Sequence, residues 1–168
     1  MAEISDKALK NNYALNKLKL KATALNSSTQ YSDESQFQTG ATSYGHAMRN
    51  RDVGQTVDQA KGLADAFVRK QFDLAKQLLS AGNIKEAYYQ FGIGLHTLQD
   101  ATSPAHGGFQ PWGDHVSPGE LVTHIAKELN YPGMKSNLQR VTNQYLDWFE
   151  NSNQPLPKEN LFNNIKHD

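Results

Sequence analysis

Two long amphipathic segments joined by a very short connection constrain this fold more than any other feature of the sequence. Gly82 stands where a left-handed helix C-cap is expected, and Asn83 is placed to cap a second helix over 84–101. A connection this short predicts an antiparallel helical hairpin. The first helix, over 55–80, is predicted from apolar residues at helical spacing: Val57, Ala60, Leu63, Ala64, Phe67, Leu74, Ala75, Leu78 and Leu79.

The rest of the sequence favours further helices and gives little support for a sheet. We expect helices over 5–26, 117–130 and 134–150, with a polar loop over 27–43 and a polar tail over 151–168. These segments predict an all-α fold, a bundle of about five helices. At 168 residues the chain is long enough to bury one core, so we expect a single helical domain.

The composition limits the kinds of site and of long-range attraction that the chain can have, without excluding nucleic acid or a membrane as substrate. The 17 Lys and Arg residues balance 17 Asp and Glu residues, so no overall field draws the chain to nucleic acid or to an anionic membrane. There is no cysteine, which excludes a disulfide framework and leaves His, Asp and Glu as ligands for any zinc. No stretch approaches the roughly 20 apolar residues that span a bilayer. The first residues lack the organisation of a signal peptide.

Three potential metal ligands surround the predicted end of the second hairpin helix. His96 and Asp100 are one helical turn apart, so both side chains should project from one face. Pro104 cannot continue the helix, and the chain can therefore turn back to present His106 to the same point. This arrangement predicts a metal site between helices, in a metal-binding core over 44–150.

A later helix repeats the spacing, because His124 and Glu128 are again one turn apart. Upstream, His46 and Asp52 form another pair of candidate ligands, and His115 lies between the two helical pairs. Spacing alone leaves a packing role open for each of these histidines.

Two aromatic residues lie in the Gly- and Pro-rich loop that contains His106. Phe109 and Trp112 could contact an acyl chain or stack on a base at the mouth of a site. Packing beneath the loop is the alternative, and the sequence does not choose between these roles.

The pattern His96-x-x-x-Asp100-x-x-x-Pro104-x-His106 resembles the central motif of the zinc-dependent phospholipase C family. It is also similar to the motif of the fungal and plant zinc-dependent single-strand nucleases, which share that fold. The resemblance covers about residues 45–128 and implies that zinc is held by His96, Asp100, His106, His124 and Glu128. Asp52 matches the region of an upstream acidic residue, which could bridge metals or act as general base. The chain has no histidine before His46, so we expect one or two zinc ions instead of the family's three.

The function that this resemblance implies is metal-dependent phosphodiester hydrolysis, with phospholipase C-like cleavage of phospholipid headgroups at a membrane surface. The alternatives are a zinc-dependent nuclease acting on single-stranded nucleic acid and a non-enzymatic, zinc-stabilised binding domain. The helical module also resembles C-terminal toxin domains of Rhs-type and polymorphic-toxin effectors. That likeness implies secretion or delivery to a target cell as part of a larger effector, with an immunity protein as partner.

Overall fold

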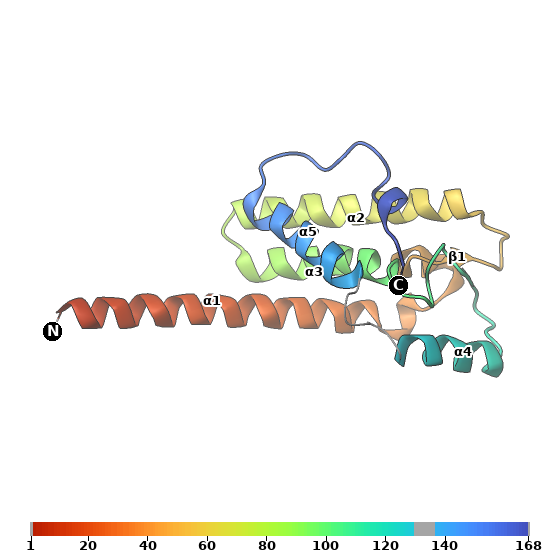
Figure 1. The fold of residues 1–168 in the computed structure, drawn as a ribbon, viewed down its shortest axis with the longest axis horizontal. Helices are drawn as coiled ribbons and strands as arrows, with labels where there is room; N and C mark the ends of the chain where they lie inside the picture. Colours follow the sequence, from red (N-terminus) through yellow and green to blue (C-terminus); the bar gives the residue numbers. More distant parts are fainter. Residues whose placement is uncertain (1, 130–136, 168) are drawn as a thin grey trace.

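The computed structural model describes residues 2–129 and 137–167, with side chains described for 15–34, 36–127 and 137–167. Its regular secondary structure is almost entirely helical, which confirms the all-α prediction (Figure 1). Two short strands, β1 (Arg49–Asn50) and β2 (Pro111–Trp112), form a small parallel ladder. The helices are α1 (Ala2–Ser32), η1 (Ser35–Phe37), η2 (Gly40–His46), α2 (Val57–Ser80), α3 (Ile84–Asp100), α4 (Pro118–Leu129), α5 (Asn137–Asn151) and η3 (Leu161–Asn164), where η marks a 3₁₀ helix.

The predicted hairpin is formed by α2 and α3. Thr56 and Gln59 close a capping box at the start of α2, with each side chain accepting a hydrogen bond from the other's backbone N–H. Gly82 ends the helix with a φ of +81°, in the left-handed region that glycine adopts without strain. Asn83 occupies the N-cap position of α3 as predicted, although its side chain makes no capping hydrogen bond.

Two glycines allow the neighbouring helices to approach α3 closely. A Cβ atom at Gly92 would lie 1.9 Å from the Oγ of Ser28 in α1, and one at Gly94 would lie 2.9 Å from the ring of Phe72 in α2. As a result α3 lies between α1 and α2, and α5 packs on the same assembly (Figure 1).

Stacked aromatic rings form the centre of the core. The Phe91 ring lies 4.3 Å from that of Phe149 with an interplanar angle of 6°, and 4.9 Å from that of Phe72 with an angle of 26°. All three side chains are fully buried. Each buried ring contributes roughly 1.5–3 kcal/mol of hydrophobic stabilisation, so this stack joins α2, α3 and α5.

Polar contacts hold α1 and α5 in place around this core. Lys21 of α1 pairs with Glu150 of α5 at 2.7 Å, and the hydroxyl of Tyr88 in α3 donates to the same carboxylate. Lys76 of α2 donates to three backbone carbonyls at the end of α5, including that of Ser152 at 2.7 Å. A cation at this position satisfies carbonyls that the helix leaves without partners.

The first helix is longer than its composition suggests. It continues to Ser32, so the predicted loop from residue 27 is wrong over its first part. Ser28 and Ser32 donate their hydroxyls to the carbonyls of Leu25 and Ser28, which lets a serine-rich segment remain helical. The ends of the helices predicted over 117–130 and 134–150 fall partly on residues 130 and 134–136, outside the described residues.

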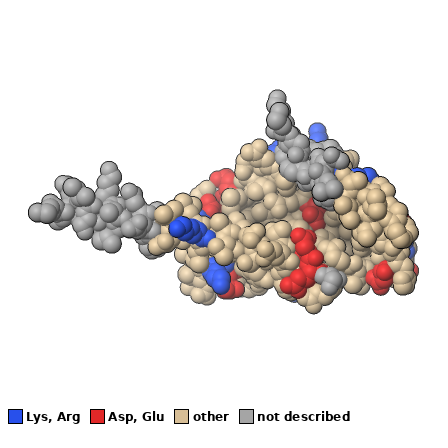
Figure 2. Space-filling view, turned by 90° about the horizontal axis from the view of Figure 1, so that it is seen from below, with Lys and Arg blue, Asp and Glu red and all other residues tan. Residues whose placement is uncertain are grey.

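Two observations bear on charge and membranes. In the face shown in Figure 2, basic and acidic side chains form separate small groups, without a large patch of either sign. Within the described residues, no helix combines the length and apolar character that crossing a membrane requires.

Candidate metal centre

The last turn of α3 presents two of the predicted ligands side by side. The Nε2 atom of His96 lies 3.2 Å from the Oδ2 atom of Asp100. His96 is buried with 7% of its surface exposed, whereas Asp100 is partly exposed. The helix therefore places an imidazole and a carboxylate at one point, as their spacing predicts.

The turn after α3 brings a second imidazole to the same carboxylate. The backbone N–H groups of His106 and Gly107 both donate to the carbonyl of Ser103, at 3.1 and 2.8 Å. The Nδ1 atom of His106 lies 3.7 Å from the Oδ2 atom of Asp100 and donates to the backbone carbonyl of His46. In the neutral ring this hydrogen bond leaves the lone pair on Nε2. The chain reversal expected at Pro104 thus returns His106 to the end of the helix.

A third imidazole comes from η2. The Nδ1 atom of His46 lies 2.9 Å from the Oδ2 atom of Asp100 and 3.4 Å from the Nε2 atom of His96. The two histidine rings are nearly perpendicular, at 88°. Thr97 donates its hydroxyl to the carbonyl of Gly45 at 2.7 Å, which attaches η2 to α3. His46, 4% exposed, is therefore held in the site by the helix that carries His96.

The residues around His46 fix its position further. Ala47 ends η2 with a φ of +51°, and its N–H donates to the carbonyls of Ser43 and Tyr44. A non-glycine residue in this region costs about 1–2 kcal/mol, which the surrounding contacts must offset. The side-chain amide of Gln38 lies 3.1 Å from the Nε2 atom of His46, on the other side of the ring from Asp100. Such outer contacts orient a ring that binds a metal.

Asp33 completes the group, although no pattern in the sequence pointed to it. It follows directly after α1, and its Oδ1 atom lies 3.3 Å from the Nε2 atom of His96. The ligand atoms of Asp33, His46 and His96 all lie within 4.8 Å of one another, so this group could hold a metal ion. The side chain of Asp33 is 54% exposed, whereas His46 and His96 are buried, so Asp33 is the member of this group that faces solvent.

The carboxylates control the charge state of the cluster. Burial alone would lower the pKa of His96, but Asp100 and then Asp33 raise it to about 10. Burial alone would raise the pKa of Asp100, but His96 and His106 hold it well below its usual range. Without a metal, a protonated His96 therefore pairs with an ionised Asp100.

The second predicted ligand pair lies close to this cluster. The ring of His124 in α4 lies 4.9 Å from that of His106 and 5.0 Å from that of Trp112. The indole N–H of Trp112 donates to the carbonyl of Gln38 at 3.1 Å. The side chain of Glu128 lies outside the described residues. The structure thus places His124 and Trp112 beside the cluster, on the His106 side.

Three other predicted site residues lie elsewhere. Asp52 accepts a hydrogen bond from the backbone N–H of Asp114 at 2.8 Å, in the loops next to β1 and β2. His115 is exposed, and its carbonyl accepts a hydrogen bond from Arg51. Phe109 is 3% exposed and its ring packs against that of Phe162, which corresponds to the packing alternative and not to a site at a cavity mouth.

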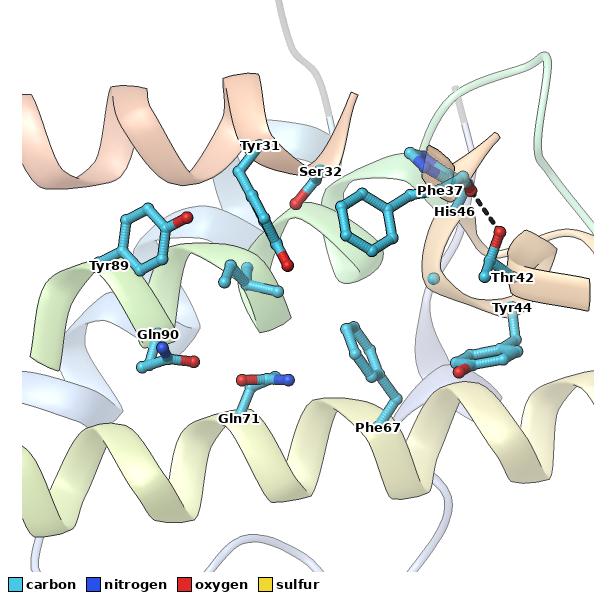
Figure 3. Close-up of a pocket in the computed structure, with 12 residues that line it drawn as sticks. Tyr31, Ser32, Phe37, Thr42, Tyr44, His46, Phe67, Gln71, Tyr89 and Gln90 are labelled. Atoms are coloured by element: carbon cyan, nitrogen blue, oxygen red, sulfur yellow. Dashed lines mark hydrogen bonds between the residues drawn. The ribbon is translucent and has the colours of Figure 1, made fainter. Parts of the chain in front are cut away.

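A cavity of about 350 Å³ adjoins the cluster at His46. It lies between the end of α1, the η2 segment and the helices α2 and α3 (Figure 3). Aromatic side chains line the part near His46, including Phe37 and Phe67, while Gln71 and Gln90 extend toward its other part. The cluster therefore has a volume beside it in which a small group attached to a reacting centre could bind.

Comparison with protein-family models, curated proteins and solved structures finds no match to this chain, so the case for its function depends on the geometry of this centre.

Proposed function

We propose that this protein is a zinc-dependent phosphodiester hydrolase that cleaves phospholipid headgroups in the manner of a phospholipase C. The observation that supports the proposal is the convergence of Asp33, His46 and His96 around the carboxylate of Asp100, with His106 at its edge. Side chains from the end of α1, from η2, from α3 and from the turn after α3 meet there.

The spacing of these donors suits zinc. Bonds of about 2.1 Å in a tetrahedral site place neighbouring ligand atoms about 3.4 Å apart. The Nε2 atom of His96 lies 3.4 Å from the Nδ1 atom of His46 and 3.3 Å from the Oδ1 atom of Asp33. Imidazole nitrogen with carboxylate oxygen is a donor set that zinc favours, whereas magnesium and calcium favour oxygen alone.

The bound ion, its ligands and the neighbouring cavity would each contribute to hydrolysis. A zinc ion held there would supply a water of lowered pKa and positive charge beside the phosphoryl oxygens. The Oδ2 atom of Asp100 faces the same nitrogens of His46 and His96 that would hold the ion, so Asp100 would serve as a further ligand beside them. Asp33, the exposed member, places the open side of the centre toward solvent, and the cavity at His46 gives part of the substrate a place to bind.

Bound metal tests the first part of the proposal. We expect the wild type, after incubation with zinc and dialysis, to retain at least one equivalent by mass spectrometry, and His96→Ala to lose it. His115→Ala is the matched control, because this exposed histidine lies outside the cluster, and it should retain the metal. Equal zinc content in all three folded proteins would refute the site.

Substrate release tests the second part. The zinc-loaded protein should release phosphorylated headgroups from phospholipid vesicles, and His96→Ala should not. Degradation of single-stranded DNA with a steep dependence on salt, without headgroup release, would instead identify a nuclease. Zinc binding without either activity would identify a zinc-stabilised binding domain.

A further inference from the structure

The described residues lining the cavity beside His46 offer no ionised partner to a charged ligand. Among the described residues that line it there is no Lys, Arg, Asp or Glu. A ligand bound there would leave bulk water without gaining an ion pair, which penalises charged groups. The lining therefore disfavours an anion and offers a cation only the faces of its aromatic rings.

Polar groups in this cavity are available to a ligand. The carboxamides of Gln71 and Gln90 and the hydroxyls of Tyr31 and Tyr89 make no hydrogen bond within the part of the chain that the structure describes. Gln71 projects from α2 and Gln90 from α3, and the Tyr31 hydroxyl points toward the space between them (Figure 3). Each carboxamide offers two donors and an acceptor, and each phenol offers one of each kind.

The aromatic residues do not form a slot for a planar base. The ring of Tyr31 is tilted by 53° against Phe37 and by 54° against Tyr89, and the rings of Tyr44 and Phe67 meet at 70°. Two of these ring pairs are thus tilted and the third packs edge to face, so none of them presents parallel faces between which a base would stack. Gln71 and Gln90 are half-buried, and an acyl chain or a trimethylammonium group covering their carboxamides would remove them from water without giving them a hydrogen-bond partner, which is unfavourable.

We propose that this cavity binds the headgroup of the substrate, and that the headgroup is an uncharged polyol of the inositol or glycerol class. Hydroxyl groups that both donate and accept match two carboxamides and two phenols, and the ring edges and faces contact the carbon skeleton. His46 lines the cavity and belongs to the metal group, so a headgroup bound there would have its phosphodiester next to the centre. The inference rests on the proposed function, and it names the substrate class.

Binding without catalysis is the first test. Saturation-transfer NMR on the metal-free protein should detect myo-inositol and not choline, and the double variant Gln71→Leu/Gln90→Leu should bind inositol about tenfold more weakly or worse. Gln77→Leu is the matched control, an exposed glutamine of α2 outside the cavity, and it should bind as the wild type does. No inositol binding by the folded wild type, binding of choline instead, or unchanged binding by the double variant would each overturn the inference.

Catalysis is the second test, and it separates the two proposals. The zinc-loaded protein should release inositol phosphate from phosphatidylinositol vesicles about tenfold faster than phosphocholine from phosphatidylcholine vesicles. Hydrolysis of bis(p-nitrophenyl) phosphate with equal rates on both vesicles would overturn the headgroup inference and leave the hydrolase intact. Inositol binding without hydrolysis of any of these phosphodiesters would support the ligand class and refute the hydrolase.

Discussion

Replacing Gly92 with alanine tests how closely α1 packs on α3. In a free helix the change is favourable by about 1 kcal/mol. In this structure the new Cβ would lie 1.9 Å from the Oγ and 2.9 Å from the Cβ of Ser28. A change of the serine rotamer removes only the first clash, so the backbones must separate, and overpacking of this kind costs about 3 kcal/mol at the upper end of its range. We therefore expect a net loss of about 2 kcal/mol in the free energy of unfolding.

Urea denaturation followed by far-UV circular dichroism measures this loss. The matched control is Gly62→Ala, because Gly62 lies within α2 and a Cβ there would meet nothing within 4 Å. That variant should gain up to about 1 kcal/mol. Asp33 follows α1 directly, so Gly92→Ala should also weaken zinc binding, whereas Gly62→Ala should not. Equal stability of the two variants would refute the packing argument.

Three further predictions follow from the same structure. Burial would raise the pKa of Glu150, but hydrogen bonds from Lys21 and Tyr88 lower it below its ordinary 4.5. The ionised Glu150 therefore contributes its full stabilisation above pH 4.5, and this contribution is lost as the pH falls through the lowered pKa. When the pH is lowered from about 6 to about 2, the urea midpoint of Glu150→Gln should therefore fall less steeply than that of the wild type. Because its raised pKa keeps a proton on His96 at pH 7, zinc must displace that proton in order to bind. Titration calorimetry at pH 7 in buffers of different ionisation enthalpy should therefore show that zinc binding releases about one proton. No proton release would contradict the assignment of His96 as a ligand. Lys76→Met should lower the free energy of unfolding by about 1–2 kcal/mol, since three carbonyls at the end of α5 lose their donor, and an unchanged melting temperature would contradict this.

Much of the helical framework could be predicted because its signals are local. Apolar spacing located α2 and α3, and Gly82 marked the turn between them. The extension of α1 could not be predicted in this way, because Ser28 and Ser32 are typical of loops until their hydroxyls bond to the preceding turn. The β1–β2 ladder was missed because each of its strands has only two residues and no alternation to read.

In the candidate site, too, the residues with a local sequence signal could be predicted and the residue that depends on tertiary packing could not. His96, Asp100 and His106 could be grouped from their spacing around a proline, and His46 was included as a candidate. Asp33 could not be found, because it approaches His96 only when α1 packs against α3. That approach depends on Gly92, whose role is visible only with the partner helix in place.

The wide separation in sequence of Asp33, His46 and His96 has a consequence for folding. A cation bound by all three would act as a cross-link between the end of α1, the η2 segment and α3, closing long loops that are open in the unfolded chain. Because these residues meet only in the folded chain, the binding free energy of the ion would add to the free energy of unfolding, in a chain that has no cysteine to form a disulfide instead. Chelation should then release α1 before the α2–α3 hairpin, so protease cleavage would begin near Asp33.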